Sequence, residues 1–318
     1  MGPAVCNHKR RPVVAYSFFF AFLLFLLSSS LSGEAPIDYK STESNLQTED
    51  IVELWVRGDQ KGAKNTRNGI DGLIQGLQPK FLIESAKVWK PGSTLRVCFL
   101  VDHQDWNGRV ATYAQEWTAI ANIMFDFGTS SEGLTYRLCP SESRDFHIRI
   151  GYDCPGVDWA LVGRESENPT LAAPCGDARK SMTLGTMTKT GATDAEIRRA
   201  VLHEFGHVLG FLHEFQHPDS GCDQEIKWDL LVPILRNARP DLNESSIRAN
   251  FLQKTRGSAY ELSVSVDKQS IMQYFIPAKL LKAGDKSPCY SQKNFDISES
   301  DRKGAQSFYP PSPEGLLE

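Results

Sequence analysis

Beyond its first 32 residues, the sequence has no long apolar run and no cluster of basic side chains. A helix that crosses a bilayer needs roughly 20 consecutive apolar residues, and a protein that binds nucleic acid usually gathers lysine and arginine on one face. We therefore expect no membrane span in the main part of the chain and no nucleic-acid partner. The 318 residues are 41% hydrophobic and 23% charged, which is ordinary for a globular protein with an ample core.

The first 32 residues have the layout of a signal peptide. Residues 1–12 contain three basic side chains and no acidic one, and an apolar run follows over residues 13–27. Ser30 and Ser32 are small residues of the kind that precede a cleavage site. Because the apolar run is shorter than the roughly 20 residues that span a bilayer, we expect cleavage after Ser32 and a secreted protein. An uncleaved membrane anchor is the alternative. Cleavage removes three positive charges and changes the formal net charge from −4 to −7, so the mature protein is acidic.

The cysteines lack the CxxC spacing of zinc sites that are built from thiolates. Cys6 leaves with the predicted signal peptide, and six cysteines remain. An even number of cysteines in a secreted protein favours disulfides, and the sequence alone leaves their pairing open. The six are Cys98, Cys139, Cys154, Cys175, Cys222 and Cys289.

One stretch, residues 203–214, contains three histidines and a glutamate in the pattern HExxHxxGxxH. His203 and His207 are four residues apart, so on an α-helix they project from the same face, about one turn apart. Gly210 stands where the helix should end, because glycine readily adopts the left-handed conformation that reverses the chain. That reversal can bring His213 towards the other two histidines.

Three neutral imidazoles leave one tetrahedral position of a zinc ion open, as in catalytic zinc sites. Zinc lowers the pKa of a bound water to about 7, so Glu204 beside that position can act as a general base. Histidines with a purely structural role are the alternative. The bare HExxH pattern arises by chance in roughly one chain of this length in a hundred, and the added glycine and third histidine make chance much rarer. His217 is a weaker ligand candidate because Pro218 follows it.

Residue periodicity predicts the elements around this motif. Apolar residues recur at helical intervals over residues 109–124, whereas residues 95–100 and 145–151 read as strands. Thr193 can cap the start of the motif helix, with Glu196 reaching back to complete a capping box. Ser298 can likewise cap a last helix over residues 299–307.

HExxHxxGxxH is the signature of the metzincin peptidases, in which a methionine turn follows downstream. Here residues 270–274 read SIMQY, which is similar to the SxMxY turn of astacins and serralysins, and GFLHE at residues 210–214 resembles the astacin form. The chain thus resembles an astacin-like zinc metallopeptidase over about residues 85–310. The resemblance implies an α+β fold with a twisted mixed sheet, an active-site helix and a cleft between two subdomains.

The resemblance also implies roles for individual residues. Met272 would form an apolar floor beneath the metal, and Tyr274 would be a swinging ligand that stabilises the tetrahedral intermediate. Gln273 departs from the histidine usual in animal astacins, which leaves subsite preferences open. Glu214 meets the new N-terminus of the mature chain in the family. The implied ligands of one zinc ion per chain are His203, His207 and His213.

The resemblance suggests a pairing for two of the cysteines. Cys154 and Cys175 occupy places similar to a disulfide that brackets the edge-strand region of astacins, and residues 145–151 would be the edge strand along which substrate pairs. The remaining pairs, taken from neighbouring segments, are Cys98 with Cys139 and Cys222 with Cys289.

Residues 33–80 read as a polar propeptide of low intrinsic order, followed by a peptidase domain at residues 81–318. Astacin propeptides share an FxGD segment whose aspartate fills the open zinc position, and residues 56–59 are a loose match. The hypothesis is that Asp59 is the latency ligand, since residues 33–80 contain no cysteine that could serve instead. A solvated turn aspartate is the alternative.

These observations predict a secreted, monomeric zinc endopeptidase that is made as a zymogen and acts on protein or peptide substrates. Glu204 would be the base and then the acid, and Tyr274 would help to stabilise the oxyanion. The alternatives are a secreted zinc-binding protein without catalytic activity and a membrane-tethered protease. Asn243 begins a glycosylation sequon that reads equally well as a helix cap.

Overall fold

The computed structural model describes residues 82–128, 136–141, 145–168, 171, 175–238, 243–251, 260–262 and 266–311. All of them belong to one compact unit, Ser44–Glu318. The predicted signal peptide and propeptide, with Asp59, lie outside the described residues, so the predicted domain boundaries stay predictions.

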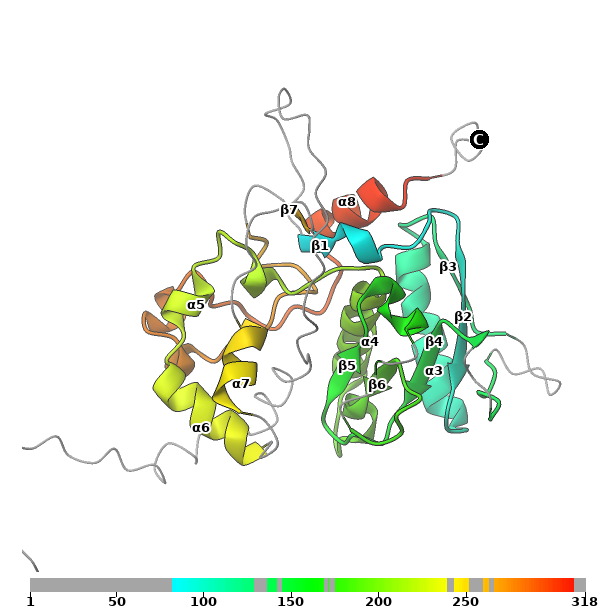
Figure 1. The fold of residues 1–318 in the computed structure, drawn as a ribbon, viewed down its shortest axis with the longest axis horizontal. Coiled ribbons are helices and arrows are strands. Elements are labelled where there is room, and N and C mark those ends of the chain that lie inside the picture. The colour runs from blue at the N-terminus through cyan, green and yellow to red at the C-terminus, as the bar shows by residue number, and fades with distance from the viewer. Residues whose placement is uncertain are drawn as a thin grey trace, which may run out of the picture. The chain divides into compact units, whose positions relative to one another are not determined.

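A five-stranded sheet forms the first layer of the domain, in the order β3-β2-β4-β6-β5 (Figure 1). The pairs of β2 with β3, β2 with β4 and β4 with β6 are parallel, and β5 is antiparallel to β6. The strands are β2 (Thr94–Phe99), β3 (Met124–Asp126), β4 (Ile148–Gly151), β5 (Asp158–Ala160) and β6 (Met182–Leu184).

The prediction that residues 145–151 form the edge strand is wrong. Strand β4 lies in the middle of the sheet, between β2 and β6, and the antiparallel edge strand is β5. Alternation of buried and half-buried side chains in β4 could not reveal its neighbours in the sheet. All three residues of β5 are buried, so this short strand shows no alternation and gave no signal.

Helices α3 (Gln104–Thr118) and α4 (Asp194–Val208) pack together and share one hydrophobic core with the sheet (Figure 1). The indole nitrogen of Trp117 in α3 donates to the carbonyl of Leu202 in α4 at 2.9 Å. The helix predicted over residues 109–124 therefore exists but begins and ends earlier. Its last predicted apolar position, Met124, belongs to β3 and is 56% exposed.

A second hydrophobic core gathers short helices that follow the histidine motif along the chain. They are α5 (Cys222–Glu225), α6 (Trp228–Ala238) and α7 (Glu244–Phe251). Phe215 and Tyr274 belong to this second core, whereas Met272 and most of α4 belong to the first. The histidine motif and the methionine turn thus connect the two cores.

Three further elements complete the described fold. Strands β1 (Leu82–Glu84) and β7 (Tyr260–Leu262) form a separate antiparallel pair, and helix α8 (Glu299–Phe308) follows near the end. Ser298 caps α8, as the sequence predicted. In the part of the chain with a described structure, no helix is both long enough and apolar enough to cross a membrane.

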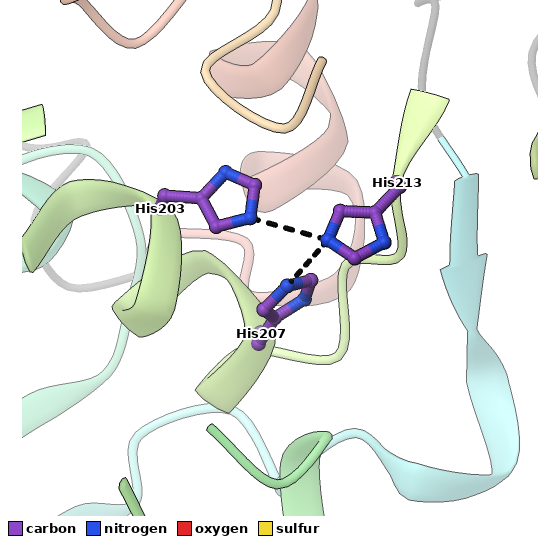
Figure 2. A group of neighbouring side chains, drawn as sticks. All are labelled: His203, His207 and His213. Atoms are coloured by element: carbon purple, nitrogen blue, oxygen red, sulfur yellow. Dashed lines mark hydrogen bonds between the residues drawn. The ribbon is translucent and has the colours of Figure 1, made fainter. Parts of the chain in front are cut away.

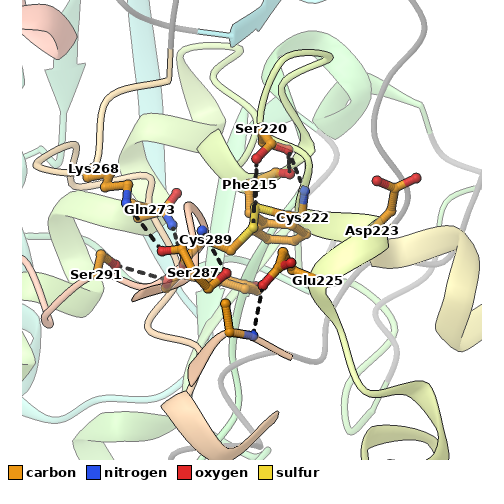
Figure 3. The surroundings of a disulfide bond; sticks show 12 residues. Phe215, Ser220, Cys222, Asp223, Glu225, Lys268, Gln273, Ser287, Cys289 and Ser291 are labelled. Carbon is orange, nitrogen blue, oxygen red and sulfur yellow. Dashed lines mark hydrogen bonds between the residues drawn. A yellow bond between two sulfur atoms is a disulfide. The ribbon is translucent and has the colours of Figure 1, made fainter. Parts of the chain in front are cut away.

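The structure contains the three disulfides that the sequence suggested, Cys98–Cys139, Cys154–Cys175 and Cys222–Cys289. The third joins the segment after His213 to the segment after Tyr274. Both of its sulfur atoms lie 3.8 Å from the carbonyl oxygen of Ser220 (Figure 3). Three disulfides fit an extracellular protein.

Candidate metal centre

Helix α4 presents the first half of the site. Thr193 and Glu196 form a reciprocal capping box at its start, and the acidic first turn complements the helix dipole. The helix ends at Val208, and Gly210 follows with φ at +98°. A Cβ atom at Gly210 would also lie 3.0 Å from a methyl group of Val88. The chain reversal therefore needs glycine here, and it carries His213 back beside the helix.

The three histidines of the motif converge (Figure 2). The Nε2 atom of His213 lies 3.0 Å from Nε2 of His207 and 3.2 Å from Nε2 of His203. All three side chains are at most 4% exposed. The three form the one group of possible metal ligands found among the described residues. His217 does not belong to it: this side chain is buried, and its Nδ1 accepts a hydrogen bond from the amide of Asp219.

The hydrogen bonds of the rings show that this donor set fits a metal ion. Nδ1 of His203 bonds to the carbonyl of Ile271, and Nδ1 of His207 bonds to the carbonyl of Phe211, each at 2.8 Å. A carbonyl only accepts, so both Nδ1 atoms carry the proton and both Nε2 atoms present a lone pair.

His213 Nε2 could donate to only one of these two lone pairs, whereas a cation at the centre satisfies all three rings. Two nitrogens bound to one tetrahedral zinc ion lie about 3.3 Å apart, close to the 3.0 and 3.2 Å observed. The residues present therefore fit zinc.

Glu204 follows His203 directly on α4 and is 3% exposed. A buried carboxylate is expensive unless a cation or a proton accompanies it. The role of Glu204 as a general base stays a prediction.

The methionine turn packs against α4 and the segment after His213. Met272 is fully buried, and its carbonyl accepts a hydrogen bond from the amide of Glu214 at 3.2 Å. A Cβ atom at Gly206 would lie 2.4 Å from the sulfur of Met272. Gly206 was not singled out from the sequence, although glycine in the middle of a helix signals a close approach.

Tyr274 lies over the histidines. Its ring centroid is 3.9 Å from that of His213 and 5.6 Å from that of His203. Phe215 stacks on both Tyr274 and His213, with ring centroids 5.1 and 5.3 Å away. The sequence offered no signal for Phe215 as a neighbour of both rings.

A scan against models of known protein families and a search of curated proteins found no match. Solved structures do match. A structure of myroilysin is similar with a TM-score of 0.58 and 22% identity, covering 73% of this chain and 99% of that chain. The chain shares the fold of myroilysin. The predicted α+β fold is thereby confirmed.

Two further structures are similar. A crystal structure of myroilysin has a TM-score of 0.49 and 24% identity over 71% of this chain and 87% of that one. High choriolytic enzyme 1, described as a hatching enzyme zinc-protease from the medaka fish Oryzias latipes, has a TM-score of 0.42 and 15% identity. That match covers 72% of this chain and 96% of that one.

Within this myroilysin-like fold, three carboxyl groups lie close to the methionine turn. Glu214 Oε2 accepts a hydrogen bond from the amide of Asp267 at 3.0 Å, and Asp267 accepts one from the hydroxyl of Ser298 at 2.7 Å. Burial, together with the charges of Asp301 and Asp267, raises the pKa of Glu214 to about 8. Burial also raises the pKa of Asp301, to about 6. No basic side chain of the described residues forms an ion pair with Glu214.

Gln273 occupies a buried place beside the third disulfide (Figure 3). Its side chain is 1% exposed, and Nε2 donates to the carbonyl of Cys289 at 3.4 Å. The residue that departs from the usual astacin pattern therefore points into the second core. It holds the segment after the methionine turn against the disulfide.

Proposed function

We propose that the protein is a zinc endopeptidase that hydrolyses peptide bonds in proteins or peptides. The observation that carries this proposal is the convergence of three buried histidine Nε2 atoms, with His213 Nε2 at 3.0 and 3.2 Å from the other two. The buried Glu204, which follows His203 directly in the sequence, supports it. A metzincin-type fold supports it.

His203, His207 and His213 would hold one zinc ion through Nε2, with the carbonyls of Ile271 and Phe211 fixing the tautomers of the first two. Bound zinc would supply Lewis-acid chemistry, activating water and polarising the scissile carbonyl. Glu204 would accept the proton of the attacking water and deliver it to the leaving amine. The hydroxyl of Tyr274 would donate a hydrogen bond to the oxygen that becomes negative.

This function can be tested by incubating the purified, processed protein with a peptide library and measuring cleavage. We expect cleavage that a chelator abolishes and zinc restores. Glu204→Gln should bind zinc as tightly as the wild type and lose nearly all turnover, because the amide cannot accept the proton. Full zinc occupancy with no cleavage by the wild type would instead favour the secreted zinc-binding protein without catalytic activity.

Secretion and zymogen activation belong to the same proposal. Residues 1–32 would be cleaved, and an extracellular form that begins after Ser32 distinguishes secretion from a membrane anchor. Asp59 would occupy the open zinc position in the proform. Asp59→Ala should then give an unprocessed protein that is active, whereas unchanged latency would contradict this role.

Glu214 would receive the new N-terminus after processing. The support is its complete burial near two other carboxyl groups, with no basic partner among the described residues. An ammonium group there would neutralise part of this negative cluster. Activity of Glu214→Gln after correct processing measures the contribution of that ion pair.

A further inference from the structure

The carboxylate of Asp301 connects helix α8 to the methionine turn. The residue is fully buried in the first turn of α8. Its Oδ1 accepts a hydrogen bond from the hydroxyl of Ser270 at 2.6 Å, and its Oδ2 accepts one from the amide of Ile271 at 2.8 Å. The same Oδ2 accepts the amide of Ser298 at 2.9 Å as part of the capping box. One carboxylate thus holds two segments about 30 residues apart in the chain.

The bonded segment leads directly to a predicted zinc ligand. The carbonyl of Ile271 is the hydrogen-bond partner of His203 Nδ1 at 2.8 Å. The hydroxyl of Ser270, which bonds to Asp301, also accepts the amide of Met272 at 2.9 Å. Moving Asp301 would therefore move both the carbonyl that bonds to His203 and the backbone of Met272.

Capping of α8 alone does not explain a buried carboxylate at this position. An exposed or partly exposed capping box would serve the helix equally well, and burial of a carboxylate is costly unless hydrogen bonds compensate it. Here, two of the three bonds that compensate it come from the methionine turn. Burial raises the pKa of Asp301 to about 6, so the group is mainly ionised at neutral pH and accepts strong hydrogen bonds.

We infer that Asp301 is a positioning residue of the metal centre, acting through Ser270 and Ile271 to fix the orientation of His203. The inference rests on the proposed zinc function and deepens it. Groups that orient metal ligands from one layer further out contribute about 10–100-fold to metal affinity or activity. Asp301 orients a group of that kind.

Substitutions at three positions separate positioning from helix capping. Ser270→Ala removes one of the two bonds on the turn side and leaves the cap of α8. Ser298→Ala removes the hydroxyl that accepts a hydrogen bond from the amide of Asp301 and donates one to Asp267. It leaves both bonds of Asp301 to the turn, so it is the control. Asp301→Asn keeps the size of the side chain and one acceptor oxygen, and should fold even if Asp301→Ala does not.

The measurement is the zinc dissociation constant of the processed protein, by competition with a chelator, together with kcat and KM of the zinc-loaded protein. We expect Ser270→Ala to raise the dissociation constant about 10-fold or more, with kcat lowered and KM unchanged. Asp301→Ala should have at least that effect, and combining it with Ser270→Ala should add little, because both remove the same bond. Asp301→Asn should recover part of the affinity.

Ser298→Ala should lower the melting temperature and leave zinc affinity within about twofold of wild type, because the bonds to the turn remain. Equal losses of affinity in Ser298→Ala and Ser270→Ala would overturn the inference, since the effect would then come from the helix end. Unchanged affinity in Ser270→Ala would overturn it as well. Zinc affinity that responds as expected in a protein without peptidase activity would leave the inference standing and refute the proposed function.

Discussion

The buried carboxyl of Asp301 predicts a specific dependence of folding stability on pH. Its pKa in the folded protein is raised by burial from its ordinary value of 3.8 to about 6, and the neighbouring charge of Asp267 acts in the same direction. Between these two values the folded state binds more protons than the unfolded state. The free energy of unfolding therefore decreases as the pH rises through this window.

The size of the effect follows from the shift. A rise of about two pKa units corresponds to about 3 kcal/mol of stability that is present below pH 3.8 and lost above pH 6. For a domain of this size, that is about 6–12 °C in melting temperature. The side chain of Asn in Asp301→Asn does not titrate, so the variant does not lose this stability as the pH rises. The free energy of unfolding of Asp301→Asn minus that of the wild type should therefore increase by about 3 kcal/mol from pH 3.5 to 6.5.

Urea unfolding of the proform, followed by tryptophan fluorescence in the presence of a chelator, measures this difference at each pH. The chelator removes the separate pH dependence of metal binding. Measurements should stop near pH 6.5, because Glu214, with a pKa of about 8, is still protonated in the folded state there. Asp285→Asn changes an exposed carboxyl and is the control, for which the difference should be flat. A flat difference for Asp301→Asn would refute the reasoning.

Three other predictions concern the packing and the metal. Gly206→Ala would place a Cβ atom 2.4 Å from the sulfur of Met272. We therefore expect overpacking to lower the free energy of unfolding by about 1–3 kcal/mol, as measured by urea unfolding. Unchanged stability would mean that Met272 moves freely. Phe215→Ala should lower the free energy of unfolding by about 3–5 kcal/mol. Because the ring of Phe215 stacks on Tyr274, this substitution should also lower kcat more than Phe251→Ala does. Equal effects on kcat would show that Phe215 acts only in the core. Zinc at a thousand times its dissociation constant should stabilise the folded protein by about 4 kcal/mol, so its removal should lower the melting temperature. Zinc should leave the melting temperature of His213→Ala nearly unchanged.

The sequence predicted the part of the site that lies within one helix and one turn. The spacing of His203 and His207 determines their common face, and Gly210 determines the reversal that brings His213 back, so local geometry was sufficient. The cap of α4 and the cap of α8 were likewise local. Resemblance added Met272 and Tyr274, whose positions no local rule supplies.

Residues that reach the site from a distance could not be predicted. Asp301 reads in the sequence as an ordinary acidic residue in the first turn of a helix, and its bonds to Ser270 and Ile271 depend on where α8 lies. The central place of β4 and the edge place of β5 depend on pairing between strands, which a short segment does not encode. Tertiary packing decided each of these features.

The position of α8 near the C-terminus affects when the histidine site can form during translation. Tyr309, just beyond α8, donates its hydroxyl to the carbonyl of Leu209 at the end of α4 and accepts the amide of Trp89, while Asp301 holds the methionine turn. During translation the histidines leave the ribosome about 90 residues before these anchors do, and chain synthesis proceeds at about 5–20 residues per second. For several seconds the nascent chain therefore contains the three histidines without the bonds that hold the methionine turn, and the histidine cluster has its full surroundings only when α8 has docked.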